Sequence, residues 1–149
     1  MNKESAIPQL FLRFALGIGF ILPVMDRLGM LGPVGQNNVG WGNWENFVAY
    51  TNVLMPYLSK SAAGIMGLIA TIAEVVFGVM LLIGLKTRYA AIGSFLLTLI
   101  FALSMAIFLG YRAPFNYSVY VVSAASLLLA GVSGYKWSID QYVYNNSIK

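Results

Sequence analysis

Four apolar runs, each long enough to cross a lipid bilayer as a helix, dominate this 149-residue sequence. A hydrocarbon core about 30 Å thick takes about 20 helical residues. The runs cover about residues 6–25, 62–85, 89–110 and 114–134. None of them alternates polar and apolar residues as a barrel strand does, and only helices or closed barrels satisfy the backbone inside lipid. The sequence therefore predicts an all-α fold: an integral membrane four-helix bundle that forms a single domain over residues 1–149.

The composition agrees with a membrane environment. Hydrophobic residues make up 59% of the chain and charged residues 9%, whereas an ordinary soluble domain is about 25% charged. Cysteine and histidine are both missing from the sequence, which excludes disulfides, thiol redox chemistry and metal or haem sites built on these side chains. We expect no cofactor bound covalently or through metal, so redox chemistry would need a diffusible carrier or a partner's cofactor. The small net charge of +4 does not indicate nucleic acid as a partner.

The segment between the first and second runs predicts an extra helix over about residues 43–55. Asn43 is suited to cap the start of this helix, and Pro56 limits its end. Its apolar and aromatic side chains fall on one stripe, and aromatic residues are enriched at membrane–water boundaries. We therefore expect an interfacial helix in the headgroup region. The alternative is a loop helix that packs on the ends of the bundle.

The distribution of Lys and Arg predicts the orientation in the membrane. With both termini on one side, that side holds the larger basic set, which is Lys3, Lys86, Arg88, Lys136 and Lys149. The opposite side holds Arg27, Lys60 and Arg112. Because cytoplasmic loops carry an excess of Lys and Arg, we expect cytoplasmic N- and C-termini, with the protein in the bacterial inner membrane.

Two charged side chains stand inside the apolar runs. Glu74 interrupts the stretch IATIAEVVFGVMLL, residues 69–82, and Arg13 interrupts the first run. Measured from the cytoplasmic side, Arg13 is about 10 Å deep and Glu74 about 16 Å deep. An isolated charge at mid-bilayer costs about 2.5–3.5 kcal/mol on insertion scales, so we expect the two to form an ion pair. Such a pair would either fix the helix register or belong to a ligand or proton site.

Small and polar side chains surround this level of the predicted bundle. One face of the second run carries Gly64, Gly67, Thr71, Glu74 and Gly78, a pattern that permits close helix approach. Hydroxyl groups of the fourth run reach a similar depth. We therefore predict a ligand-binding site or a structural intramembrane polar cluster made of Arg13, Glu74, Tyr120, Ser123 and Ser126.

A second polar group is expected where the bundle meets the far side of the membrane. It consists of Asp26, Arg27, Arg112 and Asn116. These residues would form an outer polar mouth over the bundle, or they are solvated charges at helix ends. Beyond the fourth run, Ser138 and Gln141 match a capping box, which predicts a short helix starting at Ser138.

Three stretches, taken in order, carry a family resemblance. They are LRFALGIGF with Arg13 and Gly17, EVVFGVMLLIGLKTRYAA with Glu74, Gly78, Gly84, Arg88, Ala90 and Ala91, and SID with Ser138 and Asp140. Over most of residues 8–141 the chain resembles the DoxX family (DoxX/DoxD-like) of small four-helix membrane proteins. The resemblance implies a four-helix transmembrane bundle, with Arg13 and Glu74 on the family's recurring Arg and Glu. Some relatives are subunits of thiosulfate:quinone oxidoreductase.

Three functions follow as hypotheses. The first is a quinone-interacting subunit of a membrane redox system, with Arg13, Glu74, Tyr120 and Ser123 offering hydrogen bonds and a proton site. The second is a non-catalytic accessory or scaffold subunit of a membrane protein complex. The third is binding of a lipid or small molecule within the bundle. The expected partners are the lipid bilayer, other membrane proteins and a quinone, and whether the chain is an enzyme stays open.

Overall fold

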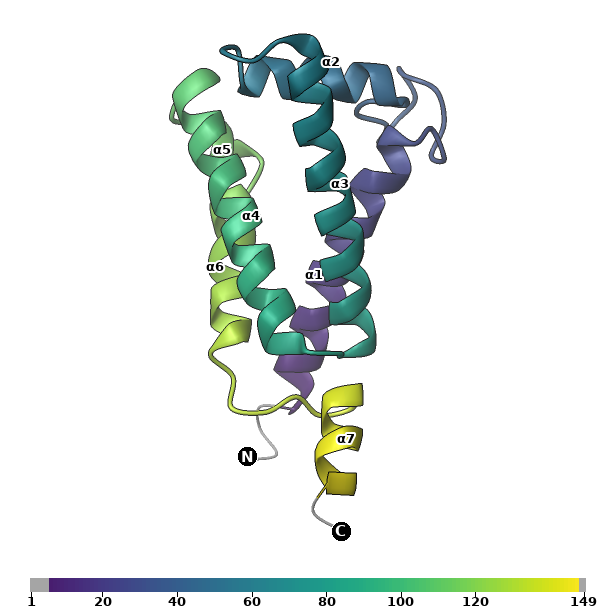
Figure 1. Ribbon diagram of the computed structural model, residues 1–149, viewed down its shortest axis with the longest axis vertical. Helices are drawn as coiled ribbons and strands as arrows, with labels where there is room; N and C mark the ends of the chain where they lie inside the picture. Colours follow the sequence, from purple (N-terminus) through teal and green to yellow (C-terminus); the bar gives the residue numbers. More distant parts are fainter. Residues whose placement is uncertain (1–5, 148–149) are drawn as a thin grey trace.

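The computed structural model describes residues 6–147, which form seven helices and no strand (Figure 1). Within this part of the chain, three helices are long and apolar enough to cross a membrane: α1 (Ala6–Arg27), α3 (Lys60–Ile83) and α4 (Thr87–Phe108). A shorter apolar helix, α6 (Val119–Ala130), packs beside α4. The prediction of an all-helical membrane bundle with an extra helix between the first two spans is confirmed.

The extra helix, α2 (Trp44–Leu54), lies across one end of the bundle, which we call the α2 end. The side chain of Asn43 caps it by accepting a hydrogen bond from the N–H of Asn46 at 2.9 Å. Phe47 is buried against α3, where a Cβ at Gly67 would lie 2.9 Å from its ring. The helix therefore packs on the bundle through a notch left by a glycine, and its placement among lipid headgroups stays a prediction.

The fourth apolar run is broken, which corrects the expectation of one helix over residues 114–134. Its first part is the short helix α5 (Ala113–Asn116), and α6 begins at Val119. Ser118 between them has a φ of 55°, a left-handed conformation that no α-helix continues through. Asn116 and Ser118 are the sequence signals of this turn, because Asn and Ser side chains favour turns.

Glycines set how closely the long helices approach one another. A Cβ at Gly17 of α1 would lie 3.0 Å from the carbonyl oxygen of Gly78 of α3, and the reverse distance would be 3.2 Å. On the other side of α3, the ring of Phe77 fills the space beside Gly93 of α4. The contact between Gly17 and Gly78 fixes the register between α1 and α3, which decides where the charged side chains meet.

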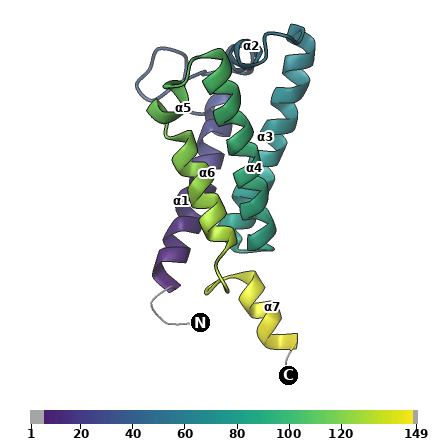
Figure 2. The ribbon, with the colours of Figure 1, turned by 90° about the vertical axis from the view of Figure 1, so that its left-hand side faces the viewer.

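The last helix, α7 (Ile139–Ser147), projects from the end opposite to α2, which we call the terminal end (Figures 1 and 2). The N–H of Gln141 donates to Oγ of Ser138 at 3.1 Å, and Oε1 of Gln141 accepts from the N–H of Trp137 at 2.9 Å. The predicted helix start after Ser138 is confirmed.

Candidate functional site

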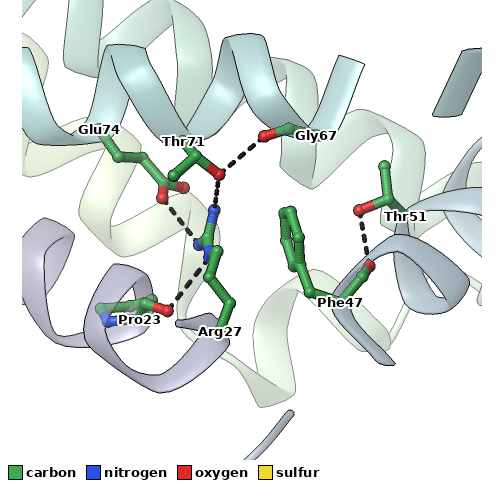
Figure 3. A network of polar contacts seen from close by, with 7 residues as sticks. All are labelled: Pro23, Arg27, Phe47, Thr51, Gly67, Thr71 and Glu74. Atoms are coloured by element: carbon green, nitrogen blue, oxygen red, sulfur yellow. Dashed lines mark hydrogen bonds and ion pairs between the residues drawn. The ribbon is translucent and has the colours of Figure 1, made fainter. Parts of the chain in front are cut away.

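The buried carboxylate of Glu74 pairs with Arg27, not with Arg13 (Figure 3). Nη2 of Arg27 lies 2.7 Å from Oε2 of Glu74, and the two side chains are only 2% and 6% exposed. Arg27 also donates from Nη1 to Oγ1 of Thr71 at 2.8 Å and from Nε to the carbonyl of Pro23 at 3.1 Å. The predicted pair of Arg13 and Glu74 is therefore wrong.

Helix register explains this correction. Because Gly17 lies against Gly78, Arg13 falls level with Gly84 at the end of α3. Arg27 lies about three turns beyond Gly17 along α1, which brings it level with the middle of α3. The depths predicted from the sequence assumed that the start of the first apolar run lies level with the end of the second run. In the structure, α1 begins about 10 Å beyond the end of α3.

Aromatic rings cover the Arg27 guanidinium on the α2 end. Its central carbon lies 4.0 Å from the ring centre of Phe47 and 5.3 Å from that of Trp41. These are distances at which a cation is attracted to a ring face. Phe47 comes from α2 and Trp41 from the loop before it, so neither belongs to a helix that spans the bundle. Neither contact was predicted from the sequence, although the small face at Gly67 marks the surface on which Phe47 packs.

Asp26 holds the loop that carries Trp41. Its carboxylate accepts hydrogen bonds from the N–H groups of Gly40, Trp41 and Gly42 at 2.8, 3.1 and 3.0 Å. A carboxylate that gathers successive N–H groups forms strong, charge-assisted hydrogen bonds. The two neighbouring residues at the end of α1 thus have different partners: Asp26 binds the loop backbone, and Arg27 binds Glu74.

The Glu74 carboxylate keeps unused hydrogen-bonding capacity. Its Oε2 is buried, and within residues 6–147 its one polar contact is the ion pair with Nη2 of Arg27, whereas a carboxylate oxygen can accept more than one hydrogen bond. Arg27 carries more N–H groups than its two hydrogen bonds use. The pair can therefore offer both a donor and a charged acceptor to an added polar group.

Arg13 stabilises the terminal end of the bundle through hydrogen bonds. Fully buried, it donates hydrogen bonds to the carbonyls of Leu81, Leu82, Lys136 and Trp137 at 3.0–3.3 Å. The first two are free carbonyls at the end of α3, and the last two belong to the segment before α7. Gly84, with a φ of 70°, lies directly against the Arg13 guanidinium, where a Cβ would collide. Arg13 thus joins three segments and lies in no contact with Glu74.

Asp140 completes this junction from the C-terminal side. Its two carboxylate oxygens accept hydrogen bonds from the N–H groups of Lys86 and Thr87 at 2.6 and 2.8 Å, which caps the start of α4. Its own N–H donates to the carbonyl of Gly84 at 2.9 Å. The SID motif therefore acts as a cap for a helix distant in sequence, a role that the sequence pattern did not assign.

Of the hydroxyl groups predicted for the polar cluster, that of Ser123 joins α6 to α4. Oγ of Ser123 donates to the carbonyl of Phe95 at 3.3 Å, and Oγ of Ser126 donates to its own helix at Val122. The Tyr120 ring packs on Phe115 with centroids 5.0 Å apart. Among the described residues, no hydrogen bond or ion pair links these three to Glu74, so the structure does not assemble the predicted cluster.

The four residues of the predicted outer mouth are also divided. Asp26 and Arg27 are buried under the loop and α2, whereas Arg112 and Asn116 are exposed on the turn and on α5. The nearest polar contact of Arg112 is the hydroxyl of its neighbour Tyr111, at 3.2 Å from Nε. The polar group that the structure does assemble is Asp26, Arg27, Thr71 and Glu74 with Trp41 and Phe47, which we call the Arg27–Glu74 site.

A family model described as "TQO small subunit DoxD" matches residues 9–149, almost the whole chain. The chain belongs to the DoxD family. The family is thus DoxD rather than DoxX itself, within the DoxX-like membrane proteins. Its long apolar helices indicate that this DoxD chain is an integral membrane protein. Comparisons with curated proteins and with solved structures found no match.

Proposed function

We propose that this DoxD chain is a quinone-interacting membrane subunit of a redox system, and that the Arg27–Glu74 site receives the quinone headgroup. The family description, the small subunit of TQO, supports a place beside a quinone-reducing partner. The observation that carries the proposal is the buried Oε2 of Glu74, whose one polar contact within residues 6–147 is the ion pair with Arg27 at 2.7 Å and which lies beside spare Arg27 donors.

The residues of the site suit the chemistry of a quinone headgroup. Its carbonyl oxygens accept hydrogen bonds, which the unused N–H groups of Arg27 can donate. Its flat ring matches the faces of Phe47 and Trp41, which already lie 4.0 and 5.3 Å from the Arg27 guanidinium. When bound, a quinone supplies an acceptor for electrons and protons. Glu74 can hold a proton beside it, and the electrons come from a partner, because the sequence lacks Cys and His.

Access to the site requires movement, because Arg27 and Glu74 are nearly closed off by their neighbours. The covering groups are Trp41 on the loop and Phe47 on α2 rather than residues of the spanning helices. Loops of this kind, held by a few hydrogen bonds, open more readily than packed helices. We propose that the segment from residue 28 to 43, which carries Trp41, moves aside to admit the headgroup, while Phe47 stays in place on α2.

The accessory or scaffold function is the second candidate, and the closure of the ion pair favours it. The side chains of this pair are only 2% and 6% exposed, and such a closed pair can act solely to fix the register between α1 and α3. Lipid binding within the bundle would use the same polar contacts as a quinone. Ligand binding and the scaffold function can be distinguished by an experiment that removes the charges of Arg27 and Glu74 while keeping the fold.

The expected position of the protein is the bacterial inner membrane with both termini in the cytoplasm, as the basic residues favour. The α2 end and the Arg27–Glu74 site would then lie toward the periplasmic side.

The test is the double variant Arg27→Met with Glu74→Leu, purified in detergent and compared with wild type. We expect it to fold, because well-packed apolar residues often replace buried ion pairs without loss of stability. We also expect it to lose co-purifying quinone and binding of a short-chain quinone analogue. The matched control is Lys60→Met with Glu45→Gln, which removes a solvent-exposed ion pair of 3.6 Å. A folded double variant with wild-type quinone binding would favour the scaffold function.

A further inference from the structure

An open hollow lies where α2 packs on the first turns of α3. Its volume is about 380 Å³, within the range of small-molecule sites, about 300–1,000 Å³. The residues that line it, three from each helix, are Trp44, Glu45, Val48, Lys60, Ser61 and Gly64. Gly64 has no side chain, and a Cβ there would lie 3.6 Å from Val48. The two helices therefore approach each other at this point without filling the hollow.

The length of α3 places this hollow at the boundary of the membrane. The helix has 24 residues and is about 36 Å long, whereas the hydrocarbon core of a bilayer is about 30 Å thick. Lys60 and Ser61 are its first two residues, and no other charged residue precedes Glu74 in this helix. The first turn of α3, and with it the hollow, therefore lies at the level of the phospholipid headgroups.

Two opposite charges line the hollow. Nζ of Lys60 lies 3.6 Å from Oε1 of Glu45, and the two side chains are 63% and 83% exposed. This distance is too long for a hydrogen bond, and an exposed pair of this kind contributes little to stability. Each of the two side chains can therefore exchange the other for a charge of a ligand at little cost.

A phospholipid headgroup with a phosphate and a primary ammonium carries the complementary charges. Its phosphate suits the ammonium of Lys60 and the hydroxyl of Ser61, and its own ammonium can donate hydrogen bonds to the Glu45 carboxylate. Trp44, in the same wall, is the aromatic residue that attracts cations best. An anionic headgroup would leave Glu45 beside a negative charge, and a trimethylated ammonium has no N–H to donate.

The face of α3 that continues from the hollow toward the middle of the membrane is apolar and uncovered. At helical spacing from Ser61, this face carries Ile65, Leu68 and Ile72, which are 60%, 50% and 55% exposed. Apolar side chains contact lipid on other faces of the bundle as well, but this stripe begins at the hollow. The headgroup and one acyl chain of a single lipid can therefore bind α3 together.

We infer that the hollow between α2 and α3 binds the headgroup of a phospholipid of the phosphatidylethanolamine type. The phosphate of this lipid lies at Lys60 and Ser61, its ammonium lies at Glu45 and Trp44, and one acyl chain follows the apolar stripe of α3. The bound lipid joins α2 to α3 at the membrane boundary. This lipid site lies on the outside of the bundle and is independent of the quinone proposed for the Arg27–Glu74 site.

The test measures lipid binding by native mass spectrometry of the full chain, purified in detergent and freed of lipid. The probes are phosphatidylethanolamine, phosphatidylglycerol and phosphatidylcholine with the same acyl chains. We expect the first lipid to bind about fivefold more tightly than the other two, as one exposed charge pair allows. Equal binding of all three lipids, or displacement of phosphatidylethanolamine by an equal concentration of free phosphoethanolamine, would overturn the inference.

Charge variants test the two halves of the site separately. Glu45→Gln removes the partner of the ammonium, so we expect phosphatidylethanolamine to bind about fivefold more weakly, while phosphatidylglycerol binds as well as before or better. Lys60→Met removes the partner of the phosphate and should weaken the binding of both lipids. The control is Arg112→Met, which removes an exposed cation elsewhere on the α2 end. A Glu45→Gln chain that keeps the wild-type preference among the lipids would contradict the site.

A further pair of variants keeps both charges and changes only the hollow. Gly64→Leu places a branched side chain in it, whereas the Cβ of Gly64→Ala meets Val48 at an ordinary contact distance. We expect Gly64→Leu to lose the preference for phosphatidylethanolamine and Gly64→Ala to keep it, with circular dichroism showing that both are folded. A folded Gly64→Leu chain with the wild-type preference would show that the lipid binds elsewhere.

Discussion

Arg27 at the end of α1 and Glu74 in the middle of α3 form a buried ion pair, with Nη2 and Oε2 2.7 Å apart. Thr71 extends the network from Arg27 along α3: it accepts from Arg27 and donates to the carbonyl of Gly67 at 2.7 Å (Figure 3). The pair thus ties the last turn of α1 to a carboxylate that would otherwise stand alone in an apolar helix.

Removing one member of this pair leaves the other charge buried. We therefore predict that Glu74→Gln lowers the free energy of unfolding in detergent by about 3–5 kcal/mol. Arg27→Met with Glu74→Leu should recover most of that loss. Glu45→Gln is the control, since an exposed pair contributes about 0–1 kcal/mol. Denaturant unfolding of the four proteins measures this, and a Glu74→Gln variant as stable as wild type contradicts the buried pair.

Asp26 is predicted to hold Trp41 over the site. Asp26→Ala removes the acceptor for three N–H groups, so the loop should loosen and Trp41 should become more exposed to solvent. We expect a red shift of the Trp41 emission in a chain where Trp44 and Trp137 are replaced by Phe. Arg112→Gln, which changes an exposed charge, should leave the spectrum unchanged. An unshifted emission in the Asp26 variant would show that the loop is held by other contacts.

Local patterns explain which parts of the fold could be predicted from the sequence. Asn43 and Ser138 cap helices through residues three positions away, so their signals lie within one turn of chain. The small face of α3 was also predicted, because Gly67, Thr71 and Glu74 follow helical spacing. These features depend on neighbours in sequence, and the structure places them as expected.

The partner of Glu74 could not be predicted, because it depends on how far α1 slides along α3. Hydropathy marks where an apolar run begins, but the approach of Gly17 to Gly78 sets the level of each charge. If α1 slides by a few residues along α3, the arginine that lies near Glu74 changes from Arg13 to Arg27. The turn at Ser118 was missed although Asn116 and Ser118 favour turns, because the run as a whole is long and apolar enough to span a membrane.

Arg13 should matter for the terminal end rather than for the ligand. Arg13→Met leaves four carbonyls without their donor, one in a buried and three in part-buried hydrogen bonds, and hydrogen bonds to a charged group each contribute about 1.5–3 kcal/mol. We predict lower stability, release of the segment before α7 and faster trypsin cleavage after Lys136. Arg88→Met, an exposed change at the same end, is the control. Unchanged cleavage in the Arg13 variant would contradict the junction.

The orientation in the membrane can be tested directly, because the natural chain has no cysteine. Single cysteines at Gln36 in the loop and at Arg88 in α4 lie at opposite ends of the bundle and are both exposed. With cytoplasmic termini, a membrane-impermeant thiol reagent should label position 36 on intact cells and leave position 88 unlabelled until the cells are opened. The reverse pattern would invert the proposed topology.

The position of the quinone is tested most directly by two chains that each keep a single tryptophan, Trp41 or Trp137. Trp41 lies beside Arg27, and Trp137 lies at the terminal end. A short-chain quinone quenches tryptophan fluorescence on close approach. We predict saturable quenching of Trp41, lost in Arg27→Met with Glu74→Leu, and only weak, non-saturating quenching of Trp137. Saturable quenching of Trp137 instead, or quenching of Trp41 that survives the double change, would contradict a quinone site at Arg27 and Glu74.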